Sequence, residues 1–160
     1  MNWEAIGAVA ELLGALGVIA TLAYLAVQIR QNTASNRNVA LQTINAQDAD
    51  SLALVSGNPA LADIFFRGNL SFGSLTLQDR VRFAFLMVQV CRIYETRLQL
   101  YIDGAIPNAI WEASLRTLEF TASFSGFREW WSIQKGLFSD DFQKLVAVTI
   151  SDPDPGKDAA

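Results

Sequence analysis

The longest apolar stretch of the chain lies near its beginning, in residues 6–29. Most of its residues are Ala, Leu, Val, Ile and Gly, and its only charged side chain is Glu11. A hydrocarbon core about 30 Å thick needs roughly 20 apolar residues in a helix. The pattern therefore predicts one N-terminal transmembrane helix, with Trp3 and Tyr24 as aromatic residues at the two interfaces.

The charges around this stretch predict its orientation. Arg30 and Arg37 follow it, and no Lys or Arg precedes it. Basic residues favour the cytoplasmic side, so we expect the N-terminus outside and the rest of the chain in the cytoplasm. Two alternatives stay open. One is a buried helix of a soluble protein, because the uncharged run after Glu11 is short for a span; the other is a cleaved signal peptide, which lacks its usual basic start here.

Two features inside the apolar stretch indicate contacts between helices. Small side chains at helical spacing form one stripe, and such stripes let helices approach closely in lipid: Ala10, Gly14, Gly17 and Thr21. Glu11 lies beside this stripe. Its carboxyl group either faces a helix interface or a pore, or it reaches the headgroup water from a position about one turn below the surface.

The hydrophobic pattern after residue 30 changes twice. Residues 31–57 carry a thin apolar seam of Leu41, Ile44, Leu52 and Val55, interrupted by Asp48. We expect a stalk helix that packs on another element or on copies of itself, and this helix can continue the first helix without a break. The alternative is a loosely packed surface helix. Further helices are predicted over 59–68, 76–102, 107–123, 127–136 and 140–150, with a loop over 68–75.

Residues that favour turns and caps mark the ends of these helices. Gly57 can end the stalk in a left-handed conformation, and Asn58 can cap the helix that Pro59 opens. Thr76, Ser139 and either Ser123 or Ser125 are the other expected N-caps. The fold class is therefore all-α, in four parts: an anchor (1–30), a stalk (31–57), a small helical bundle in the cytoplasm (58–151) and a disordered tail (152–160).

The composition excludes several chemistries. The chain has no His, so Ser–His–Asp triads and His-ligated metal sites are ruled out. Its single Cys91 lies in an apolar run and is expected to be a buried, inert thiol. Glu112 and Glu119 lack matching carboxylates on another helix, so no metal site is expected. No cluster of Lys and Arg indicates a nucleic-acid surface, and the net charge is −4.

One set of residues resembles a known pattern. The segment YLAVQIRQNT that closes the apolar stretch resembles a signature of small bacterial membrane proteins of uncharacterised function, and the match extends over most of the chain: Arg92, Tyr94, Glu95, Tyr101, Gly104, Trp111, residues 127–131, Phe138 and Phe142. The resemblance implies a protein of the bacterial inner (cytoplasmic) membrane with a helical cytoplasmic domain. It implies no catalytic residue.

The candidate polar site consists of Arg92, Glu95, Arg128 and Glu129. Aromatic residues near these positions could form the walls of a pocket for a small anion or an aromatic ligand, or they could be core while the charges join helix ends. We therefore expect a non-enzymatic membrane-anchored module without a cofactor. Its expected partners are the bilayer and either copies of itself or another membrane protein. The alternatives are a homo-oligomeric channel or membrane sensor subunit with Glu11 in the pore or at a helix interface, and a helical domain that binds a small ligand.

Overall fold

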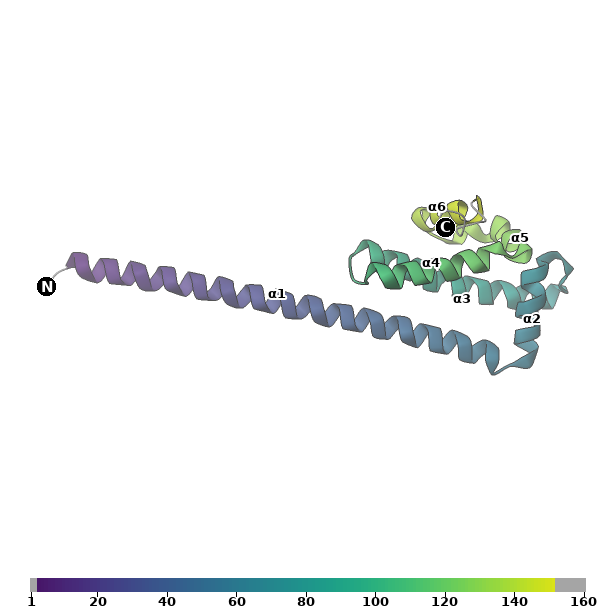
Figure 1. Cartoon of the computed structure of the whole chain (residues 1–160), viewed down its shortest axis with the longest axis horizontal. Coiled ribbons are helices and arrows are strands. Elements are labelled where there is room, and N and C mark those ends of the chain that lie inside the picture. Colours follow the sequence, from purple (N-terminus) through teal and green to yellow (C-terminus); the bar gives the residue numbers. More distant parts are fainter. Residues whose placement is uncertain (1–2, 152–160) are drawn as a thin grey trace, which may run out of the picture. The chain divides into compact units, whose positions relative to one another are not determined.

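The structure is a computed structural model that describes the backbone of residues 3–151, and their side chains except those of 3–10, 12, 13 and 15. Within this range the chain forms six α-helices, two 3-10 turns and no strand (Figure 1), which confirms the all-α class. The tail 152–160, expected to be disordered, lies outside the described residues, as does the side chain of Trp3.

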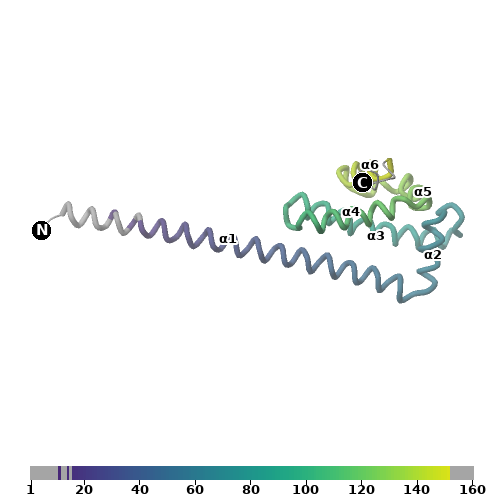
Figure 2. Tube along the Cα trace, in the orientation of Figure 1, coloured from purple at the N-terminus to yellow at the C-terminus, as the bar shows by residue number. Residues whose placement is uncertain are grey.

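The chain divides into two compact units, Met1–Val39 and Ala40–Ala160. Helix α1 (Trp3–Ser56) contributes to both and has no break at residue 30, where we expected the anchor to meet the stalk. Because the units divide between residues 39 and 40, residues 40–57 of the expected stalk belong to the same unit as the helices that follow. The course of these helices from α2 to α6 can be followed in Figure 2.

Among the described residues, no helix is long and apolar enough to qualify as a membrane span. The predicted span starts at residue 6, and its side chains at 6–10, 12, 13 and 15 lie outside those that are described. The span stays a prediction.

The helices of the second unit begin and end close to the predicted positions. They are α2 (Pro59–Leu70), α3 (Leu77–Ile102), α4 (Asn108–Ser123), α5 (Ser125–Gln134) and α6 (Asp140–Ser151), with 3-10 turns η1 (Phe72–Ser74) and η2 (Lys135–Leu137). Three predicted N-caps are confirmed, because the side chains of Asn58, Thr76 and Ser139 accept backbone N–H groups at 3.1, 3.2 and 3.4 Å.

Helix α1 ends at Ser56, next to the predicted Gly57, but two predicted caps are wrong. Gly57 does not adopt a positive φ; among the described residues only Gly104 does, at φ 68° after α3. Neither Ser123 nor Ser125 caps α5, whose N-cap is Phe124. The Ser125 hydroxyl instead donates to the carbonyl of Leu70 at 2.5 Å, so it joins α5 to the end of α2.

An aromatic core holds the second unit together. Its fully buried side chains come from every helix after α2, and Ile64 of α2 packs on them: Phe83, Met87, Cys91, Leu118, Ala122, Phe127, Trp130, Phe142 and Val146. Trp131 stacks on Phe127 and on Phe138, with ring centres 6.0 and 5.2 Å apart. Burial of each large aromatic ring stabilises the unit by about 2–3 kcal/mol.

Two glycines let α2 pack closely on its neighbours, Gly126 on the side of α5 and Gly68 on the side of α3. A Cβ added to Gly126 would lie 1.8 Å from the carbonyl oxygen of Gly68, and a Cβ on Gly68 would lie 2.1 Å from the ring of Phe83. The predicted loop over 68–75 is therefore wrong at its start. Gly68 lies inside α2, which runs to Leu70. Close packing, not a turn, is what requires a glycine at this position.

A smaller apolar cluster includes two residues from the C-terminal third of α1. Ala40 and Ile44 are buried with Ile106 and Trp111. Tyr101 stacks on Trp111 with 5.1 Å between ring centres. The predicted seam thus packs at Ile44 on its own chain, whereas Leu52 stays exposed.

Candidate functional site

Arg92 and Glu95 of α3 are brought together as the sequence predicts. Arg92 Nη1 donates to Glu95 Oε2 at 2.5 Å, and Arg92 Nη2 donates to the carbonyl of Leu137 at 2.7 Å. The guanidinium also lies 5.0 Å from the ring centre of Phe138. Glu95 Oε1 accepts the backbone N–H of Ser139 at 2.6 Å. The pair therefore joins α3 to η2 and to the start of α6.

These contacts set the charge state of Glu95. Burial acts to raise its pKa, but hydrogen bonds from Ser139 and the nearby Arg92 guanidinium outweigh that effect, so the pKa is lowered. A carboxylate held ionised in this way is a poor proton acceptor at neutral pH. The pair is suited to holding a helix end rather than to acid–base chemistry.

Arg128 and Glu129 of α5 lie in other contacts. Arg128 Nε donates to the carbonyl of Ala122 at 2.8 Å, and Glu129 Oε2 accepts the N–H of Gly73 at 2.7 Å. Among the described residues, no hydrogen bond or ion pair connects either of them to Arg92 or Glu95. The four predicted residues do not assemble into one polar site, and the aromatic residues expected as its walls lie mostly in the core.

A hollow of about 380 Å³ does adjoin Glu95. It is open to solvent and lined by side chains of α3 and the start of α6: Glu95, Thr96, Leu98, Gln99, Ile102, Ser139 and Asp141. Both carboxylates give it an acidic rim, and Arg92 does not line it. An anionic ligand is therefore disfavoured here.

The residues of the N-terminal unit that were singled out are exposed where they are described. Glu11, Gly14, Gly17 and Thr21 all face solvent, and nothing lies within 4 Å of a Cβ placed on either glycine. The hydroxyl of Thr21 donates to the carbonyl of Gly17 at 2.8 Å, which leaves the stripe without a free polar donor. The side chain of Ala10 lies outside the described residues.

Arg97 is the residue that the sequence analysis missed. Its side chain is only 7% exposed, although it carries a full charge. Its Nη2 donates to Asp48 Oδ1 of α1, and its Nη1 donates to Ser114 Oγ of α4 at 3.3 Å. The guanidinium carbon lies 5.6 Å from the ring centre of Tyr94, and Nε has no hydrogen-bond partner. A buried charge is tolerated when it is paired in this way.

A hollow of about 240 Å³ lies beside this ion pair. Its apolar wall consists of Leu41, Ile44, Ile110 and Ala113, and its polar wall of Asn45, Asp48, Arg97, Ser114 and Thr117. The space equals that of about eight liquid waters. Since Asp48 and Arg97 compensate each other, the lining is close to neutral and suits a compact polar molecule that carries no net charge.

Two buried titratable groups of α3 have raised pKa values. Burial raises the pKa of the Cys91 thiol well above its usual range, and the negative charge of Glu95 adds to this. Burial likewise raises the pKa of Tyr94. A neutral, buried thiol is a weak nucleophile. Among the described residues, no group of three or more Cys, Asp or Glu side chains is arranged to hold a metal ion.

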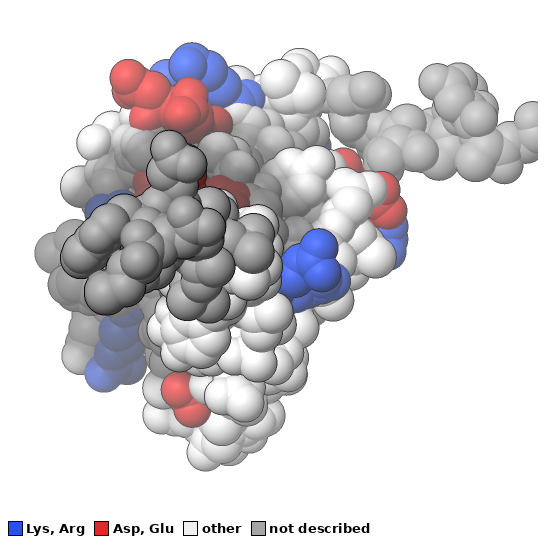
Figure 3. Space-filling view, turned by 90° about the vertical axis from the view of Figure 1, so that its left-hand side faces the viewer, with Lys and Arg blue, Asp and Glu red and all other residues white. Residues whose placement is uncertain are grey.

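The charged residues visible in Figure 3 form separate small groups of either sign among larger neutral areas. A scan against models of known protein families and searches of curated proteins and of solved structures found no match to this chain.

Proposed function

We propose that this protein is a non-enzymatic, membrane-anchored assembly module, in which α1 enters a bilayer and associates with copies of itself. One observation carries the proposal: large apolar side chains of α1 are exposed around most of the helix. They are 44–66% exposed and comprise Leu16, Val18, Ile19, Leu22, Tyr24, Leu25, Val27 and Ile29. At about 100° per residue, they surround the helix except for one sector of about 100°, which holds Gly14, Gly17 and Thr21.

The distribution of these side chains favours lipid over a protein partner as their cover. A helix that docks on a protein has one apolar stripe and polar residues elsewhere, whereas a helix that is apolar on every side suits a membrane. Gly14, Gly17 and Thr21 lie on one side of this segment with open space around the glycines. That side lets a second helix approach closely, so it supports self-association within the membrane.

Disulfide trapping in membranes tests the association. Thr21→Cys places a thiol on the small-residue side, and Ala23→Cys places one on the opposite side about 160° away, counted at 3.6 residues per turn. We expect oxidation of native membranes to give covalent dimers with Thr21→Cys and monomers with Ala23→Cys. The buried Cys91 provides a silent background. Equal trapping at both positions, or none at either, would contradict self-association through this side.

Extraction of membranes with alkaline carbonate tests the anchor separately. Full-length protein is expected in the membrane pellet. Replacing Leu22 and Leu25 with Lys is expected to move it to the soluble fraction, because each charge in a span costs about 3 kcal/mol. Recovery of the unmodified chain in the soluble fraction would contradict the anchor, and the alternative of a soluble protein would then stand.

A second candidate function, binding of a small ligand, rests on the hollow beside Arg97. Its polar wall contains hydroxyl, amide, carboxylate and guanidinium groups from three helices. A thermal-shift screen of uncharged polar molecules and zwitterions would test it, with Ser114→Ala as the variant that removes one polar group. No stabilisation of the unmodified protein by any compound would count against this function.

A further inference from the structure

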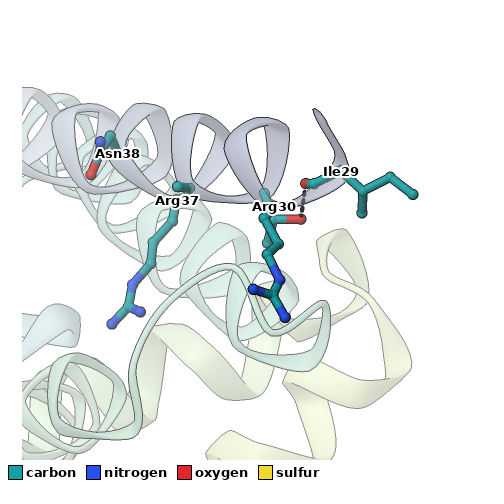
Figure 4. Close-up of a pocket in the computed structure, with 6 residues that line it drawn as sticks. Ile29, Arg30, Arg37 and Asn38 are labelled. Atoms are coloured by element: carbon teal, nitrogen blue, oxygen red, sulfur yellow. Dashed lines mark hydrogen bonds between the residues drawn. The ribbon is translucent and has the colours of Figure 1, made fainter. Parts of the chain in front are cut away.

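The side chains that follow the apolar part of α1 form a cationic hollow. Arg30, Ala34 and Arg37 are spaced four and three residues apart, so they share one face of the helix. Both arginine side chains extend from the same side of it (Figure 4). The small Ala34 lies between them and leaves space, and the hollow is further lined by Ile29, Thr33 and Asn38.

The two guanidinium groups are free to bind an anion. Both are exposed, and neither forms an ion pair with a described residue. Residues 12–47 contain no Asp or Glu, so these two arginines are the only charges in that part of the sequence. The Thr33 hydroxyl donates to the carbonyl of Ile29 at 2.9 Å, drawn as a dashed line in Figure 4, and so leaves hydrogen-bond donation to the arginines and Asn38.

The surroundings of the hollow indicate the rest of the ligand. On its N-terminal side, Ile29 is 66% exposed and continues into the apolar surface of α1. A phosphate held between the arginines would therefore have hydrocarbon contacts available on one side only. A guanidinium binds phosphate oxygens with a pair of parallel hydrogen bonds. A phosphate group joined to acyl chains can contact both the arginines and the apolar surface of α1 next to them.

We propose that Arg30 and Arg37 bind the phosphate of an anionic phospholipid whose acyl chains lie along the apolar part of α1. The inference rests on the proposed membrane anchor, because the ligand is part of the bilayer. Each basic residue at an anionic membrane surface contributes roughly a fivefold preference. Together the two arginines give roughly a 25-fold preference for an anionic over a zwitterionic lipid.

Native mass spectrometry tests this preference on the full chain in an uncharged detergent. The protein is offered equal amounts of dioleoyl phosphatidylglycerol and dioleoyl phosphatidylcholine, and the ratio of the two bound lipids is measured. We expect the ratio to fall about fivefold in Arg30→Gln or Arg37→Gln and about 25-fold in the double variant. Arg116→Gln removes the same charge from an exposed position on α4 and should leave the ratio unchanged.

Further arms separate the possible failures. The double Lys variant keeps both charges but lacks the planar guanidinium, so a ratio between those of the unmodified chain and the Gln variants supports the phosphate contacts. Equal binding of both lipids, or equal effects of Arg116→Gln and Arg30→Gln, would overturn the inference while leaving the anchor intact. Displacement of phosphatidylglycerol by an equal concentration of inorganic phosphate would identify a free anion as the ligand instead. Retention of neither lipid would overturn the anchor itself.

Discussion

The two ends of the chain use large apolar side chains in opposite ways. In residues 16–29 of α1 the large apolar side chains that are described are exposed, whereas in α3 to α6 many of them pack in one aromatic core, with Phe85 and Phe120 among the exposed exceptions. The two regions differ in composition, because residues 12–29 carry no charged side chain. They also differ in distribution, because the charged residues of α3 lie mainly away from its core face. The second unit is thus stabilised by its own core, whereas the described side chains of residues 16–29 belong to no such core.

Truncation of one aromatic ring in the core should have the largest effect on the stability of the second unit. Phe127→Ala removes a side chain that is 0% exposed and is expected to destabilise the second unit by about 3–5 kcal/mol through loss of burial and a residual cavity. Leu22→Ala, at an exposed position, should change the same unfolding transition by less than about 0.5 kcal/mol. Urea unfolding in mild detergent, followed by tryptophan fluorescence, measures both. Equal effects would show that the two regions unfold as one.

The close approach of α2 and α5 gives the next largest effect. Gly126→Ala forces the backbone of the two helices apart, since the new Cβ would meet the Gly68 carbonyl at 1.8 Å, and should cost about 2–3 kcal/mol. Gly136→Ala is the matched control, because nothing lies within 4 Å of a Cβ there. A Gly126→Ala protein with unchanged stability would mean that the helices do not pack in this way.

The ion pair of Arg97 and Asp48 should give an intermediate effect. Asp48→Asn leaves a buried guanidinium without its counter-charge and is expected to cost about 2 kcal/mol, less than for a fully buried pair because Asp48 is 51% exposed. Adding Arg97→Met should recover part of this loss, since no buried charge remains. Asp141→Asn, which removes an exposed pair with Lys144, should cost less than about 0.5 kcal/mol. Thermal unfolding of these three variants and the unmodified protein at pH 7 would measure the differences.

The contacts of Glu95 predict the smallest effect, and a dependence on pH. A carboxyl group with a lowered pKa in the folded state contributes stability above its unfolded pKa, near 4.3. That contribution is lost as the pH falls through the folded pKa. Glu95→Gln should therefore cost about 1 kcal/mol at pH 7 and progressively less below pH 4. A difference between the two proteins that grows on acidification would contradict the assigned contacts.

The sequence was sufficient to predict the helices of the second unit because their ends carry local signals. Asn58 before Pro59, Thr76 before Asp79 and Ser139 before Asp140 are read from neighbouring residues, and each is found as an N-cap. Ser125 failed as a cap because a distant group, the Leu70 carbonyl, accepts its hydroxyl. Gly68 was misread for the same reason, since the need for a small residue there arises from the distant ring of Phe83.

The pair of Arg97 and Asp48 had a signal that was not used. Asp48 interrupts the apolar seam of α1, and Arg97 lies three residues after Tyr94 on the core face of α3. Two interruptions of opposite charge in two apolar faces indicate that the faces meet there. Whether Arg92, Glu95, Arg128 and Glu129 assemble into one site could not be predicted from the sequence. It depends on how α5 is placed on α3, and no local sequence pattern encodes that placement.

The position of Cys91 allows the rate at which the core of the second unit opens to be measured. The chain has one cysteine, and its side chain is 0% exposed among the core residues of α3. A thiol reagent can modify it only when the core separates, so the labelling rate at high reagent concentration equals the rate at which the second unit opens. Labelling in detergent and in vesicles would therefore show, without any substitution, whether events at α1 alter the lifetime of the folded core.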